Sequence, residues 1–147
     1  MSLETYDELK VSLKNWLDRD DPDPFLGDFI RLAESRFNRI LRLRAMERKE
    51  KTDTVGGQSN YKLPNDFLQG REFRLNTSTT KSLQYITPEI YESWNLGQGL
   101  PKFYTIVADE LKLGPVPSDE IEMEMLFYGK VPSLGSTRPT NWILLNA

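Results

Sequence analysis

The sequence predicts an α+β protein in which an N-terminal pair of helices precedes an antiparallel β domain, sandwich- or barrel-like, with one short inserted helix. Apolar residues recur at helical spacing over the first third of the chain. After that they alternate with polar residues in several short runs. The length, 147 residues, fits one domain or one domain with an appendage. We therefore expect a helical region over 1–50 and a β domain over 51–147.

The first helix is expected to begin at Thr5, which can cap it together with Glu8 in a capping box. Its apolar stripe consists of Tyr6, Leu9, Leu13, Trp16 and Leu17. An acidic, proline-containing linker follows at 18–24 and ends the helix. The linker does not match a calcium loop, because the sixth position is Asp23 rather than glycine and the twelfth is Phe29 rather than glutamate.

A second helix is expected from Asp23 and Pro24, with its apolar stripe made of Phe29, Ile30, Ala33, Phe37, Ile40 and Leu41. Leu32 and Leu43 widen this stripe to roughly half of the helix, more than the ~100° that a simple surface helix needs. One interpretation is a helix packed in a groove between two other elements of the chain. The other makes Leu32 and Leu43 packing residues against a neighbouring subunit.

The remainder of the chain shows strand and turn signals. We expect strands at 51–55 and 58–63 around the turn Gly56-Gly57, further strands at 67–75 and 81–86, a short helix from Pro88 to Trp94, a hairpin of 103–107 with 111–113, and an alternating strand at 121–128. The last eight residues resemble the opening of an apolar helix. They are either a final strand or the start of a C-terminal helical extension that this chain lacks.

Composition disfavours most enzyme chemistry, because the chain has no cysteine and no histidine. Thiol nucleophiles, serine triads and cysteine- or histidine-based metal sites are thereby excluded. Glu122 and Glu124 share one strand face, which leaves a carboxylate-dependent hydrolase as an alternative. A sugar-binding module is kept with it because of the aromatic residues Tyr85, Tyr91, Trp94, Phe103 and Tyr104. We expect no enzyme activity, no metal and no cofactor.

Charge is distributed asymmetrically although the net charge is only −3. Residues 1–30 carry eight acids and three bases, whereas residues 31–51 carry eight bases and three acids. The basic residues are Arg31, Arg36, Arg39, Arg42, Arg44, Arg48, Lys49 and Lys51. They could form a solvated face with local pairs such as Arg31 with Glu34, dock on an acidic protein surface, or contact DNA phosphate without reading sequence. The last possibility makes a small nucleic-acid-binding protein a further alternative.

No run of residues approaches the ~20 apolar residues of a membrane span, and the N-terminus lacks the pattern of a secretory signal. We therefore expect a cytosolic origin and no membrane partner.

Six short segments, in order along the chain, resemble motifs of the tailed-phage head-to-tail adaptor proteins. The segments are FIRLAESRFNR at 29–39, LPNDF at 63–67, GLPKFY at 99–104, LKLGPVP at 111–117, FY at 127–128 and NWIL at 141–144. In that family the last motif usually opens further C-terminal helices.

The resemblance implies a structural protein rather than an enzyme. Adaptors of this family form a ring, typically of twelve copies, beneath the portal protein, extend the channel for double-stranded DNA and dock the next tail protein. The resemblance thus implies a place at the head-to-tail junction of the virion, after assembly in the host cytoplasm. On this reading the helical region faces the portal or a neighbouring copy, and the eight basic residues are candidates for an interface or the DNA channel.

Overall fold

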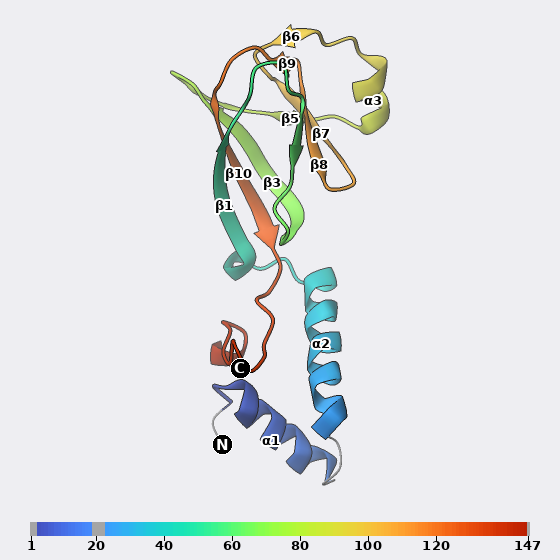
Figure 1. Cartoon of the computed structure of the whole chain (residues 1–147), viewed down its shortest axis with the longest axis vertical. Helices are drawn as coiled ribbons and strands as arrows, with labels where there is room; N and C mark the ends of the chain where they lie inside the picture. The colour runs from blue at the N-terminus through green and yellow to red at the C-terminus, as the bar shows by residue number, and fades with distance from the viewer. Residues whose placement is uncertain (1–2, 19–22, 147) are drawn as a thin grey trace. The chain divides into compact units, whose positions relative to one another are not determined.

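The computed structural model describes residues 3–18 and 23–146 and confirms the α+β class (Figure 1). The chain forms two compact units, one of residues 1–46 with 130–147 and one of residues 47–129. We call them the helical unit and the β unit. The expected regions were 1–50 and 51–147. In the structure the C-terminal segment groups with the helices, and the first strand begins before residue 50.

The helical unit contains α1 (Tyr6–Leu17), α2 (Asp23–Ile40) and two short 3₁₀ turns, η1 (Arg44–Met46) and η2 (Leu144–Asn146). The expected capping box is present at the start of α1. The Glu8 backbone N–H donates to Thr5 Oγ1 at 3.3 Å, and the Thr5 N–H donates to the Glu8 carboxylate at 3.2 Å. The linker predicted at 18–24 lies mostly outside the described residues.

Hydrogen bonds join the C-terminal segment to α2. The backbone N–H of Val131 donates to Asn38 Oδ1 at 2.8 Å, and that of Leu134 donates to Glu34 Oε1 at 2.7 Å. Both side chains lie on the face of α2 that also holds the buried Leu26 and Ile30. The segment after the last strand therefore completes the helical unit, and its end forms η2 rather than a strand.

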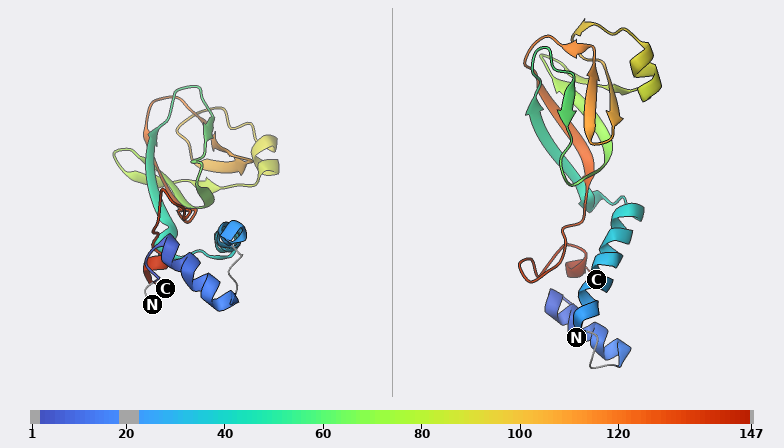
Figure 2. Two further views of the ribbon diagram at one scale, coloured as in Figure 1. Left: turned by 60° about the horizontal axis from the view of Figure 1, so that its bottom comes forward. Right: turned by 45° about the vertical axis from the view of Figure 1, so that its right-hand side comes forward.

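The β unit is built on two four-stranded sheets (Figure 2). The first has the order β1-β10-β3-β4 and is antiparallel throughout. The second has the order β2-β8-β7-β5, in which β5 and β7 run parallel. The strands of the first are β1 (Glu47–Asp53), β10 (Glu122–Gly129), β3 (Phe67–Asn76) and β4 (Thr80–Ser82), and those of the second are β2 (Asn60–Lys62), β8 (Glu110–Gly114), β7 (Phe103–Val107) and β5 (Gln84–Tyr85).

The inner faces of the two sheets supply the core. Phe73, Phe127 and Leu111 are fully buried. They belong to a cluster that draws residues from β2, β3, β8 and β10. The alternation predicted for the last strand is confirmed, since Met123, Met125 and Phe127 are buried on one face of β10. The small helix α3 (Pro88–Ser93) and the pair β6 (Gln98–Gly99) with β9 (Val116–Pro117) complete the unit.

Two expectations about the strands differ from the structure, one about a hairpin and one about a continuous strand. The runs around Gly56-Gly57 do form strands, but β1 pairs with β10 and β2 pairs with β8, so they are no hairpin. The run expected as one strand at 81–86 divides at Leu83 into β4 and β5, which lie in different sheets. In both places the chain passes from one sheet to the other, a long-range choice that local alternation does not encode.

Candidate functional site

The eight basic candidates do not share one element. Arg31, Arg36 and Arg39 lie on α2, and Arg42 and Arg44 follow it in the helical unit. Arg48, Lys49 and Lys51 lie on β1 in the β unit, although the sequence placed most of this stretch before the first strand. The basic candidates thus fall into two sets, one in each unit.

The lysines of β1 pair with carboxylates of β10. Lys49 Nζ lies 3.0 Å from Glu124, and Lys51 Nζ lies 2.8 Å from Glu122. On the other side of β10, Arg74 Nε also lies 3.0 Å from Glu124. The Glu124 side chain is only 7% exposed, and the cationic groups of Lys49 and Arg74 both contact its carboxylate. The same-face placement predicted for Glu122 and Glu124 is thus present, and their partners are cations rather than a second acid.

We call these ion pairs of β1, β10 and β3 the charge ladder of the first sheet. They account for the pKa shifts of Glu122, Glu124 and Lys51. The hydrogen bonds from Lys51 and Asn76 hold the pKa of Glu122 below its usual range. The hydrogen bond from Lys49 lowers the pKa of Glu124, against the opposing effect of its burial. In return, the hydrogen bond to Glu122 and its charge raise the pKa of Lys51. Charges arranged in this way stabilise the ionised forms and make poor general acids or bases at neutral pH.

On α2 the expected pairing differs. Arg31 lies 3.6 Å from Asp28, with both side chains exposed, while Glu34 is buried and accepts from Leu134. Arg42 donates to the carbonyl oxygens of Asn38 and Leu41 at 2.9 and 2.6 Å, which satisfies the C-terminal end of the helix.

Three of the basic candidates in the helical unit are uncommitted. The guanidinium groups of Arg36, Arg39 and Arg44 make no hydrogen bond or ion pair with any residue that the structure describes, and all three side chains are exposed. Arg44 lies beyond the end of α2 at Ile40.

α2 has a second apolar face that the described chain leaves uncovered. Phe25, Phe29, Leu32 and Ile40 are between 52% and 66% exposed. Together with Arg36 they recur at intervals of four, three, four and four residues, as in a helix that packs against another helix. We call these five residues the exposed stripe of α2. The second candidate, Leu43, is also exposed just beyond the helix.

The sequence placed Phe29 and Ile40 in the buried stripe, but burial on α2 is confined to the face of Leu26, Ile30 and Glu34. The periodicity of the sequence predicted one wide apolar stripe on α2. In the structure one half of that stripe is buried and the other half is exposed. A sign of the division was present in the sequence, since Arg36 falls among the apolar residues of the exposed half.

An apolar cavity of about 290 Å³ lies within the helical unit. Leu9 and Leu13 of α1 line it, with Ile30 and Phe37 of α2 and Leu144 of η2. No residue of α1 is fully buried, and Trp16 at its end is 87% exposed. The side chains of α1 are therefore packed less completely than those of α2, on which Leu26 is fully buried.

The aromatic candidates form two separate edge-on pairs. Tyr85 and Tyr104 have ring centroids 5.5 Å apart and Trp94 and Phe103 also 5.5 Å, with interplanar angles of 63° and 74°. Tyr91 donates to the Leu113 carbonyl oxygen at 2.9 Å, and burial raises the pKa of Tyr104. The rings thus do not form one flat stacking face.

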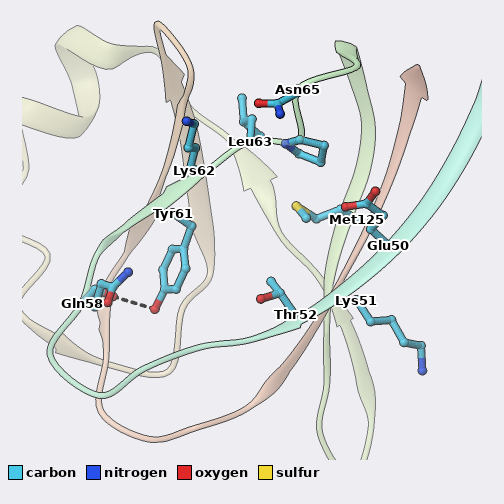
Figure 3. A pocket seen from close by; sticks show the side chains of 10 residues that line it. Glu50, Lys51, Thr52, Gln58, Tyr61, Lys62, Leu63, Asn65 and Met125 are labelled. Atoms are coloured by element: carbon cyan, nitrogen blue, oxygen red, sulfur yellow. Dashed lines mark hydrogen bonds between the residues drawn. The ribbon is translucent and has the colours of Figure 1, made fainter. Parts of the chain in front are cut away.

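A cavity of about 530 Å³ lies beside β1 and β2 (Figure 3). Glu50 and Thr52 of β1, Tyr61 of β2 and Met125 of β10 line it. The Tyr61 hydroxyl donates to the Gln58 carbonyl oxygen at 2.8 Å. Among the described residues, Glu50 is the one carboxylate that lines this cavity and Glu34 the one that lines the apolar cavity. Neither set of described lining residues includes the carboxylate pair that glycoside hydrolysis needs.

In the part of the chain that the structure describes, no group of three or more acidic side chains could hold a metal ion. Of the described helices, none is both long and apolar enough to cross a membrane. The described residues present three surface features: the exposed stripe of α2, the uncommitted arginines and the open edges of the sheets.

The comparisons with known proteins identify a family for this chain. A search of curated proteins found no match. The family model described as SU10 adaptor protein matches residues 4–147, which includes both the helical unit and the β unit. The match supports the resemblance to phage adaptors given by the sequence motifs. The chain therefore belongs to the SU10 adaptor protein family, whose members are structural adaptors of phages.

Proposed function

We propose that the chain is a non-enzymatic head-to-tail adaptor that forms a ring beneath the portal of a tailed phage and docks the next tail protein. The ring extends the channel through which double-stranded DNA passes, and twelve copies are expected in the virion. Family membership supports the adaptor role. The observation that carries the ring is the exposed stripe of α2.

An apolar helix face of this kind is costly to leave in water. Each large apolar side chain gains roughly 1.5–3 kcal/mol when it is fully buried, and four of them share the stripe. Leu32 is the most exposed of these four, at 66%. We assign the stripe, with Leu43 beyond it, to the contact with a neighbouring copy or the portal.

The uncommitted arginines fit the same role. Arg39 lies about 60° around the helix from Arg36, on the side away from the buried Ile30. A few separate guanidinium groups attract phosphate without sequence preference, which suits a channel through which DNA must slide. Arg36, within the stripe, is instead placed to pair with a carboxylate of the neighbouring surface.

The test is co-sedimentation of the purified chain with the portal of the same phage, followed by electron microscopy. We expect a ring of copies on the portal for the natural chain, and loss of the ring for Leu32→Asp. The matched control is Ser35→Asp, which adds the same charge one turn further along α2, outside the stripe. Equal assembly of both variants would remove the stripe from the interface, and no association of the natural chain would remove the adaptor role.

A further inference from the structure

The first sheet of the β unit ends in two free edges, β1 and β4. On β1 the direction of the backbone groups is fixed by Thr54, whose N–H donates to the Ile121 carbonyl oxygen at 2.9 Å. In an antiparallel ladder this direction alternates, so the even-numbered residues of β1 bond to β10. The N–H and C=O groups of Lys49 and Lys51 therefore lie along the free edge.

At the opposite edge, one hydrogen bond likewise fixes the direction of the backbone groups of β4. The Leu83 N–H donates to the Phe73 carbonyl oxygen at 2.7 Å, which directs the backbone of Leu83 and Lys81 towards β3. The backbone groups of Thr80 and Ser82 consequently lie on the free edge of β4. All three residues of β4 are exposed.

Each edge also carries one uncommitted charge on the inner face of the sheet. Glu50 is directly opposite the buried Met125, and Lys81 is directly opposite the buried Leu75. Directly paired residues share a face, so both side chains stand on the core side. Neither the Glu50 carboxylate nor the Lys81 ammonium has a hydrogen bond or ion pair with another residue in the described ranges.

Space is available next to the β1 edge. The cavity of about 530 Å³ is lined by Glu50, Lys51 and Thr52 of β1 on one side and by Tyr61 and Lys62 of β2 on the other (Figure 3). Glu50 thus lines an open seam between the edge strands of the two sheets.

We propose that β4 of one copy pairs antiparallel with β1 of the next copy, with Lys81 opposite Glu50, so that the sheet continues from copy to copy. In this register Thr80 lies opposite Lys51 and Ser82 opposite Lys49, and all four residues turn their backbone groups towards one another. The inference rests on the proposed function, because it describes how adjacent adaptor copies meet.

The two edges suit a ring because they are different surfaces. A contact between β4 of one copy and β1 of another is head-to-tail, and such a contact closes only through cyclic symmetry. Two copies joined in this way leave one edge of each kind free, so growth continues until the ring closes.

The contact is weak for a single pair of copies. β4 has three residues, and exposed lysines on β1 are a common device against strand pairing in solution. Pairing is therefore expected when copies are held side by side on a portal, where the effective concentration is high.

Disulfide trapping tests the register directly, because the chain has no cysteine of its own. In the variant Glu50→Cys/Lys81→Cys, the proposed pair is a non-hydrogen-bonded one with Cα atoms about 4.5 Å apart, which a disulfide can bridge. Within one chain the two positions are separated by three strand spacings, roughly 14 Å, too far for a disulfide. Any disulfide therefore joins two copies.

The double variant is oxidised mildly, alone and mixed with the portal, and analysed on non-reducing gels. We expect a ladder of multimers that extends to the ring size in the portal sample and collapses on reduction. The matched control is Glu50→Cys/Asp109→Cys, which moves the second thiol to the exposed β7–β8 turn and is expected to give no ladder. The charge-exchanged variant Glu50→Lys/Lys81→Glu is expected to assemble like the natural chain, whereas Lys81→Glu alone is expected to assemble less.

The outcomes separate the two proposals. Absence of the ladder in both samples, or a ladder of equal strength from the control variant, overturns the strand pairing. If the portal still carries a ring of copies in that experiment, the adaptor function stands and only the pairing is wrong.

Discussion

Glu34, in the middle of α2, accepts a hydrogen bond of 2.7 Å from the backbone N–H of Leu134, one hundred residues further along the chain. Glu34 is 7% exposed, which is unusual for a glutamate. Its carboxylate therefore fastens the segment after β10 to the helix, and it does so from the face of α2 that also holds the buried Leu26 and Ile30.

Replacing Glu34 should loosen the helical unit. Glu34→Ala removes a hydrogen bond to a charged group and leaves the Leu134 N–H without its acceptor, a loss of about 1.5–3 kcal/mol. Glu34→Gln keeps an oxygen at the same place and should lose less. Urea unfolding monitored by tryptophan fluorescence measures both. An unchanged midpoint for Glu34→Ala would contradict the assigned role of the contact.

The charge ladder of the first sheet predicts acid sensitivity. The pKa values of Glu122 and Glu124 are lowered in the folded chain, so their contribution to stability is complete above the ordinary pKa of 4.5. It is lost as the pH falls below that value through the lowered pKa. The pKa of Lys51 is raised, so its contribution is lost only as the pH rises above the ordinary 10.5.

Thermal unfolding between pH 7 and pH 3 checks this prediction. We expect the melting temperature of the natural chain to fall below pH 4.5 and the fall to be shallower in Glu124→Gln. The control is Glu120→Gln, an exposed residue with no ion pair within the described chain. If the melting temperature of Glu124→Gln fell with pH as steeply as that of the natural chain, the charge ladder would not be the cause of the acid sensitivity.

The core of the β unit should respond strongly to truncation. Phe127 is fully buried on β10 and packs against Phe67, with ring centroids 5.4 Å apart. Phe127→Ala should lower the free energy of unfolding by about 3–5 kcal/mol. Glu120→Ala, on the exposed loop before β10, should change it by no more than about 0.5 kcal/mol. Chemical denaturation of both variants tests the difference, and equal values would contradict the assigned core.

DNA binding by the isolated chain should be weak. Only Arg36, Arg39, Arg44 and Arg138 combine an exposed side chain with the lack of an ion pair or side-chain hydrogen bond among the described arginines of the helical unit, and the net charge is −3. We expect dissociation constants for duplex DNA no tighter than about 10⁻⁶ M at physiological salt. Fluorescence anisotropy with labelled DNA measures this. Tight, salt-sensitive binding would favour the nucleic-acid-binding alternative.

Local signals predicted the elements well. The capping box at Thr5, the start of α3 after Thr87 and the alternation of β10 each depend on residues close in sequence, and all three are present. The strand pairing of β1 and β2 was not predicted, because their partners β10 and β8 lie far away in the sequence.

The candidate site was predicted only in part for the same reason. Leu32 was recognised from its place on the helix wheel, and it is exposed. Lys49 and Lys51 were grouped with the arginines of α2 because they follow them in sequence, whereas their partners Glu124 and Glu122 lie more than seventy residues away. Glu50 was not predicted as a site residue, since nothing in the neighbouring sequence indicates that it lines an open seam.

Electron cryomicroscopy of the chain bound to the portal of its phage tests the proposed ring. We expect a closed ring of copies on the portal, with Leu32 buried at an interface. Copies that bind singly with Leu32 in solvent, or a portal that remains bare, would contradict it.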